Sequence, residues 1–89
     1  MKKILFLQLD DAHFVIETKL FLNRYYHELS QFDLYLCSIN NQHQIQGPWK
    51  ELLLEELSEH EFEMRINMSL SEKSWEVARD IKTKNVVGT

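Results

Sequence analysis

The stretch ILFLQLDD, from Ile4 to Asp11, decides the fold class of this chain. Five of the six residues from Ile4 to Leu9 are apolar, and the run stops at two adjacent acids, Asp10 and Asp11. A continuous apolar run that ends at polar residues is typical of a strand buried on both faces of a parallel sheet. We therefore predict a first strand here, with the two acids at its carboxyl end.

The apolar residues after this strand recur at helical intervals. They are Val15, Leu22, Tyr26 and Leu29. This spacing predicts a helix over residues 11–30. Phe14, Ile16 and Thr18 also alternate with polar neighbours. A hairpin that pairs residues 4–9 with residues 13–18 is therefore the alternative.

The rest of the chain continues to alternate between strand and helix patterns. We expect a buried strand over 32–39, a loop or short return strand over 40–46, a helix that starts at Gly47 and Pro48, and a strand over 61–69. Trp49, Leu52, Leu53 and Leu57 fall on one side of the expected second helix. Ser69 and Glu72 have the spacing of a capping box, which predicts a last helix. Residues 85–89 form a fourth short strand or a tail.

The third expected strand alternates between apolar and polar side chains. One face would carry Phe62, Met64, Ile66 and Met68, and the other face would carry Glu61, Glu63, Arg65 and Asn67. This pattern is typical of a strand with one face in water. Such a strand at the edge of a sheet, or an exposed Trp49, would favour a homodimer.

The order of these elements predicts an α/β fold in one small domain over residues 1–89. Strand and helix alternate as βαβαβα, with a fourth short strand as an addition, and such alternation implies parallel strands joined by right-handed crossovers. We expect a minimal flavodoxin-like or Rossmann-like sheet.

Composition excludes several classes of protein. The 89 residues carry a net charge of −4 with no cluster of Lys and Arg, which argues against nucleic-acid binding. The apolar run at the N-terminus is too short for a signal peptide or a membrane span, so we expect a cytoplasmic protein that does not bind a membrane. Cys37 is the single cysteine, which excludes an internal disulfide.

Four polar residues are expected at one rim of the sheet. Asp10 and Asp11 follow the first strand, and Asn40 and Asn41 follow the second. Ligands bind beyond the carboxyl ends of parallel strands, and these oxygen-bearing side chains suit a cation such as Mg²⁺ or a polar ligand. The simpler interpretation is that one acid caps the first helix and the other opposes its dipole.

Two segments resemble the receiver domains of bacterial response regulators. KKILFLQLDD is similar to the start of those domains, where an acid pair after the first strand holds Mg²⁺, and FDLYLCSIN is similar to their phosphoacceptor strand. The resemblance implies a cation-sensing α/β module that uses Asp10 and Asp11. Ser38 stands where the family has its phosphorylated Asp. The segment FDLYLCSIN also comes one strand–helix unit earlier than the phosphoacceptor strand of the family. The resemblance therefore covers the α/β pattern and not the phosphoacceptor.

Signatures of catalysis and of cofactor binding are missing from the sequence. Two glycines cannot supply a dinucleotide-binding turn or a P-loop, so no cofactor is expected. The histidines show no HExxH pattern, and Cys37 lies in an apolar strand without an adjacent base. The sequence therefore favours a protein that is not an enzyme.

An acidic run is the one strong departure from an even charge distribution. Its members are Glu51, Glu55, Glu56, Glu59, Glu61 and Glu63. On a helix, Glu51, Glu55 and Glu59 would form one row beside Glu56, with Trp49 as an aromatic anchor nearby. We expect a small interaction or regulatory protein, of the inhibitor, immunity, antitoxin or adaptor type, which binds a basic protein partner through this acidic helix face.

Overall fold

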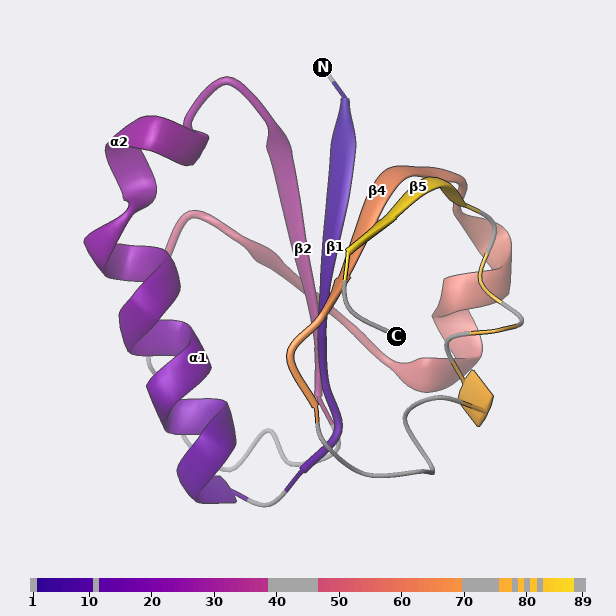
Figure 1. Ribbon diagram of the computed structural model, residues 1–89, viewed down its shortest axis with the longest axis horizontal. Helices are drawn as coiled ribbons and strands as arrows, with labels where there is room; N and C mark the ends of the chain where they lie inside the picture. Colours follow the sequence, from indigo (N-terminus) through magenta and orange to yellow (C-terminus); the bar gives the residue numbers. More distant parts are fainter. Residues whose placement is uncertain are drawn as a thin grey trace.

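A parallel sheet of five strands lies at the centre of the molecule (Figure 1). The computed structural model describes residues 2–10, 12–38, 47–69, 76–77, 79, 81 and 83–87. The strands are β1 (Lys3–Gln8), β2 (Asp33–Ser38), β3 (Lys50–Leu52), β4 (Phe62–Asn67) and β5 (Thr83–Val87). The helices are α1 (Ala12–Arg24), the single turn α2 (Tyr26–Leu29) and the 3₁₀ helix η1 (Leu54–Glu59).

The strands are arranged in the order β3-β2-β1-β4-β5, and every neighbouring pair is parallel. This order matches the first five strands of a Rossmann sheet, and without the three-residue β3 it matches the first four of a flavodoxin-like sheet. The prediction of a minimal α/β fold of this type is therefore confirmed.

Side chains of β1 fill two hydrophobic clusters, one on each face of the sheet. Leu5 and Leu7 pack with residues of η1, including Leu57, on one face. Ile4 and Phe6 pack with Leu22 of α1 on the other face. Figure 1 shows α1 and η1 on opposite sides of the strands. The apolar run from Ile4 to Leu9 is thus buried on both faces, as its sequence predicts.

Residues 13–18 belong to α1, so the hairpin alternative is wrong. Val15 and Leu22 are fully buried on the helix side that faces the sheet. β1 pairs on both sides with parallel strands, β2 and β4, which leaves no free edge for a hairpin strand. The expected helix over 11–30 is present as α1 and α2, with a break at Tyr25.

The helix expected from Pro48 is replaced by β3 and η1. β3 forms hydrogen bonds with the free edge of β2, and this pairing buries Leu52 beside Cys37. Trp49 is 8% exposed and packs with Ile4 and Phe6 instead of starting a helix. A Cβ at Gly47 would stand 2.0 Å from Cζ3 of Trp49, so glycine is needed here to make room for the indole. The burial of Trp49 and Leu52 stabilises this arrangement more than the helix propensity of the leucine-rich segment would stabilise a helix.

The expected strand over 61–69 is present as β4, and it lies inside the sheet between β1 and β5, so it is not an edge strand. Met64 and Ile66 pack toward the α1 side, as the alternation predicts, but Phe62 joins the cluster on the opposite face. Arg65 is buried, so the prediction that it faces water is wrong. β5 pairs with β4, which places β4 inside the sheet and confirms the expected fourth strand.

Parts of the last helix lie within the described residues. Glu76, Val77 and Arg79 are helical, whereas Glu72 of the expected capping box, residues 40–46 and most of residues 70–82 lie outside the described part. Within the described residues, no helix has the length and apolar character that crossing a bilayer requires.

Candidate interaction surface

Three aromatic side chains of the first helical segment lie in one exposed stripe. Phe14, Phe21 and Tyr25 are 39%, 41% and 39% exposed. Their spacings of seven and four residues place them along one flank of α1, about 90° from Val15 and Leu22, which face the sheet. The N–H of Tyr25 donates to the carbonyl of Phe21 at 3.1 Å, and their rings lie 4.8 Å apart. The stripe therefore continues one residue beyond the end of α1.

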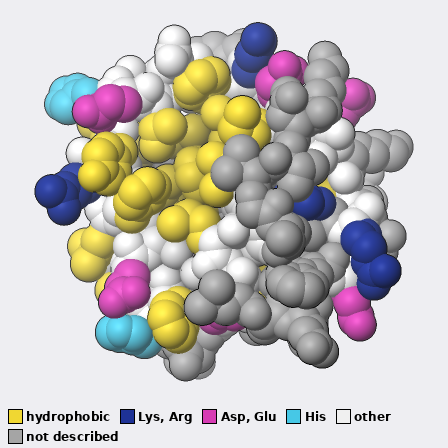
Figure 2. Space-filling model, in the orientation of Figure 1, with side chains coloured by type: hydrophobic (Ala, Val, Ile, Leu, Met, Phe, Trp, Pro, Cys, Tyr) yellow, Lys and Arg dark blue, Asp and Glu magenta, His cyan; other side chains and the backbone are white. Residues whose placement is uncertain are grey.

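Further hydrophobic side chains lie on the α1 side of the sheet. Phe32, Met64, Ile66 and Met68 are partly buried, and they pack against the cluster on the α1 side of the sheet. In Figure 2, hydrophobic side chains gather on this side of the molecule in one continuous area. Parallel sheets are usually covered on both faces, and no described helix covers β4 on this side. We call this surface, formed by Phe14, Phe21, Tyr25, Phe32, Met64, Ile66 and Met68, the α1–β4 face.

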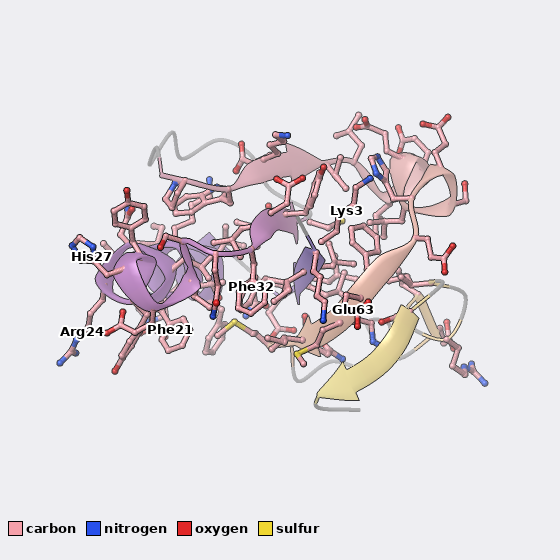
Figure 3. The ribbon with its side chains drawn as sticks, turned by 90° about the horizontal axis from the view of Figure 1, so that it is seen from above. Lys3, Phe21, Arg24, His27, Phe32 and Glu63 are labelled. Carbon is pink, nitrogen blue, oxygen red and sulfur yellow. The ribbon has the colours of Figure 1, made fainter. Side chains whose placement is uncertain are left out.

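Charged side chains of both signs border the aromatic stripe. On α1, Glu17 and Arg24 lie beside it, on the side away from the sheet. Glu17 pairs with His13 at 3.2 Å, and the Arg24 guanidinium lies 5.8 Å from the centre of the Tyr25 ring. Figure 3 shows Phe21 and Arg24 projecting from the same side of the helix. An apolar centre with a mixed polar border is the usual anatomy of a protein interface.

Hydrogen bonds join the carboxyl ends of β1 and β4, the point where ligands bind in many α/β sheets. The Leu9 N–H donates to Ser69 Oγ at 2.6 Å, and the Ser69 hydroxyl donates to the Leu7 carbonyl at 3.3 Å. The Gln8 amide donates to the Met68 carbonyl at 3.0 Å and to Thr18 Oγ1 at 3.3 Å. These polar groups satisfy one another, so this junction is a structural connection between two strands.

The expected cation site lies mostly outside the described residues. Asp10 is half-buried, and its N–H donates to Gln8 Oε1 at 2.9 Å. Asp11, Asn40 and Asn41 lie outside the described part of the chain. Within the described part, no three His, Cys, Asp or Glu side chains are placed to hold a metal ion.

The acidic residues do not form the expected helical row. Glu51 is in β3, and its carboxylate lies 2.7 Å from the Lys19 ammonium. Trp49 is buried, so it offers no exposed anchor. Glu55, Glu56 and Glu59 belong to η1, where the Glu56 carboxylate accepts the Leu53 N–H at 2.9 Å. A continuous row of Glu51, Glu55 and Glu59 would need an α-helix, and the chain instead changes from strand to 3₁₀ helix between them.

Tyr35 lies in a polar and aromatic cluster near the amino ends of the strands. The ammonium groups of Lys3 and Lys50 each lie 5.6 Å from the centre of its ring. Its hydroxyl donates to Asp33 at 3.1 Å, and the Lys3 ammonium lies 3.3 Å from Nδ1 of His60. Burial and the adjacent Asp33 carboxylate raise the pKa of Tyr35. The two ammonium groups over the ring stabilise the cluster, and no nucleophile and base are paired in it.

Cys37 is fully buried in β2. Burial, with smaller contributions from the Glu55 and Glu56 carboxylates, raises the pKa of its thiol to about 12. A thiol with this pKa is protonated at neutral pH and is a poor nucleophile. A cavity of about 400 Å³ lies nearby, lined by Leu54, Glu55, Leu57, Ser58, Val77 and Ile81. Its lining is mainly apolar and does not include the thiol.

The aromatic stripe is the feature that the sequence analysis missed. The predicted helical spacing contains Val15 and Leu22, whose burial is confirmed, and Tyr26, which is 43% exposed. Phe14, Phe21 and Tyr25 show a second helical spacing in the same segment. A helix with two apolar stripes carries more apolar surface than one sheet covers, and this signal was available in the sequence.

Comparison with known proteins adds no family to this description. No protein-family model matches the sequence, and no curated protein or solved structure is similar to it at a significant level. The function therefore has to be inferred from the surfaces of the chain itself.

Proposed function

We propose that this protein is a non-enzymatic interaction protein that binds a protein partner through the α1–β4 face. The observation that supports the proposal is the exposure of Phe14, Phe21 and Tyr25, together with the partly buried Met64 and Ile66 on the α1 side of the sheet. Contiguous apolar patches of this kind are uncommon on monomeric proteins and mark interaction sites when polar residues surround them. Aromatic residues and Met are also enriched at protein contacts.

The chemistry of the face favours a protein over other classes of partner. Its centre is apolar, and it lacks the clustered Lys and Arg that phosphate groups need. The bordering Glu17 and Arg24 have opposite charges, which suits a partner with a mixed polar border of its own. A protein surface with an apolar centre meets both conditions.

The remaining acidic residues provide a second contact surface in this proposal, for a separate and basic protein. Glu55 and Glu59 are exposed on η1, on the opposite side of the sheet from α1. They give this end of the molecule a negative field that attracts a basic partner and raises its association rate. We assign the binding energy to the α1–β4 face, because surface charges contribute mainly to rate and selectivity.

Affinity capture from the source cell tests the proposed function. The bait is the full chain, compared with a Phe21→Glu variant and with a Leu20→Glu control. Leu20 is 55% exposed on the same helix but lies about 100° or more from the stripe, so both variants add one carboxylate to an exposed apolar position. We expect a stoichiometric protein that the wild type and the control retain and that Phe21→Glu loses. Equal retention by all three baits would refute the proposal.

A further inference from the structure

We propose that the partner of the α1–β4 face is a second copy of this chain, with the two α1 helices antiparallel across a two-fold axis. This inference rests on the proposed function, because it identifies the protein that the face binds. It assigns the dimer contact to α1, and not to an edge strand or to Trp49.

The aromatic flank of α1 has the spacing of a coiled-coil seam. Phe14, Thr18, Phe21 and Tyr25 are separated by four, three and four residues. These intervals correspond to positions d, a, d and a of a heptad, the positions that pack one helix against another. Thr18 is buried at the base of this seam, where its hydroxyl donates to the Phe14 carbonyl at 2.9 Å. Along the helix, Phe14 precedes Thr18, and Phe21 and Tyr25 follow it.

An antiparallel arrangement pairs these positions in a regular way. It places Phe14 of one copy against Tyr25 of the second copy, and the small Thr18 against the large Phe21. The two-fold axis then repeats both layers with the copies exchanged. Each layer contains one a and one d position, and aromatic groups meet at the two ends of the contact.

The charges beside the seam distinguish the antiparallel arrangement from the parallel one. Glu17 and Arg24 are seven residues apart and both occupy position g of the same heptad. Antiparallel helices bring their g positions together, so Glu17 of each copy meets Arg24 of the other. Parallel helices would direct the g positions toward positions e of the second copy, which are Val15 and Leu22, and both are buried in the core of their own chain. Charge complementarity along α1 therefore selects a second copy in antiparallel orientation.

The aromatic stripe supplies part of the apolar area that a dimer of this kind buries. Aromatic side chains have about 150–250 Å² each to bury, so three rings about 40% exposed offer roughly 180–300 Å². Phe32, Met64, Ile66 and Met68 extend this apolar centre toward the sheet. A specific interface buries about 800 Å² per partner, of which a little over half is apolar. The bordering charges supply polar area around the apolar centre.

Sedimentation of the purified full chain tests the proposal directly. We expect a reversible dimer at about 100 μM, with Leu20→Glu unchanged and with a dimer dissociation constant raised about tenfold or more by Phe21→Glu. Circular dichroism and thermal melting establish that each variant is folded. A wild-type chain that is monomeric at this concentration would overturn the homodimer.

A charge exchange tests the orientation of the helices. Glu17→Arg or Arg24→Glu alone places like charges together and should weaken the dimer, whereas the double exchange restores opposite charges and should recover its affinity. Mixing a Phe14→Cys chain with a Tyr25→Cys chain under oxidising conditions should cross-link them, and neither chain should cross-link with itself. The antiparallel dimer would be overturned if the double variant dimerised more weakly than both single variants. Preferential cross-linking of the Phe14→Cys chain with itself would also overturn it.

The two proposals fail in different ways. The wild type could be monomeric in sedimentation and yet capture a different protein that the Phe21→Glu variant does not retain. This result would refute the homodimer and support the interaction function. If Phe21→Glu leaves both self-association and capture unchanged, the α1–β4 face is not a binding surface and both proposals fall.

Discussion

The Lys19 ammonium lies 2.7 Å from the Glu51 carboxylate, which joins the middle of α1 to the edge strand β3. The Lys19 side chain is 1% exposed, and the Glu51 side chain is 38% exposed. A buried ammonium is stabilised by a nearby carboxylate, and a carboxylate in such a pair contributes little to the field at the surface. Glu51 is therefore a structural residue, which explains why it does not belong with the acidic residues of η1.

Removing the Glu51 charge should destabilise the fold. Glu51→Gln takes the carboxylate away from a buried cation, and because Glu51 is partly exposed we expect a loss of about 1–2 kcal/mol. Lys19→Met removes the buried charge and keeps an unbranched side chain of similar length. The double variant should therefore lose less stability than Glu51→Gln alone when measured by urea unfolding. Glu51→Gln with wild-type stability would show that the ion pair does not stabilise this fold.

The junction between β1 and β4 depends on the hydroxyl of Ser69. Ser69→Ala removes the acceptor of the buried Leu9 N–H, which donates to Ser69 Oγ at 2.6 Å in the wild type. A buried donor without its acceptor costs about 1–3 kcal/mol, and we expect that loss of unfolding free energy. Hydrogen exchange should also become faster at the Leu9 amide. Ser58→Ala is the control, since Ser58 is exposed on η1 and its loss should change stability by less than about 0.5 kcal/mol.

The fold class followed from local patterns, whereas the surfaces depended on tertiary contacts. The apolar run of β1 and the helical spacing of Val15 and Leu22 are each sufficient to identify their elements. The segment from Trp49 to Glu59 was misassigned, because pairing with the free edge of β2 extends a sequence that would otherwise favour a helix. The position of β4 inside the sheet depends on β5, which comes sixteen residues later, and no pattern within β4 reports it. The spacing of the aromatic stripe is present in the sequence, but it overlaps the helical spacing of the buried residues Val15 and Leu22, which alone is enough to predict the helix.

The thiol of Cys37 should make stability fall at alkaline pH. Its pKa is about 12 in the folded chain against 9.0 for an unperturbed thiol, so between these values the folded state keeps a proton that the unfolded state releases. The contribution of the protonated thiol to the free energy of unfolding is fully present below pH 9.0, and it is lost as pH rises toward about 12. Tyr35, whose pKa is also raised, acts in the same direction above pH 10.0.

A Cys37→Ala variant separates the thiol from the other groups. Urea unfolding between pH 8 and about 11 should show a shallower loss of stability for the variant than for the wild type, while the Tyr35 contribution is common to both. Iodoacetamide should label the native thiol slowly and label it fast in urea. Parallel pH curves for the two proteins, or fast labelling of the folded chain at pH 8, would contradict a buried and protonated Cys37.

The negative field of η1 should act on the association rate and not on the fold. Glu56 accepts the Leu53 N–H, so the informative variant changes only the exposed Glu55 and Glu59 to Gln. Loss of these charges should leave the unfolding free energy within about 0.5 kcal/mol of the wild type. With a basic partner obtained by affinity capture, the variant should associate more slowly, its rate should depend less on salt, and dissociation should change little.

A matched variant shows whether this effect belongs to η1. Glu28→Gln with Glu76→Gln removes the same charge from two exposed positions in other helical segments, and therefore changes the net charge by the same amount. If both double variants slow association equally, the effect is one of net charge, and η1 is not a docking site. A slower rate confined to Glu55→Gln with Glu59→Gln would locate the encounter at η1, because a specific electrostatic contact acts within roughly one Debye length, about 8 Å at physiological ionic strength. An unchanged rate in both variants would leave η1 as a solvated surface whose charges contribute only to solubility.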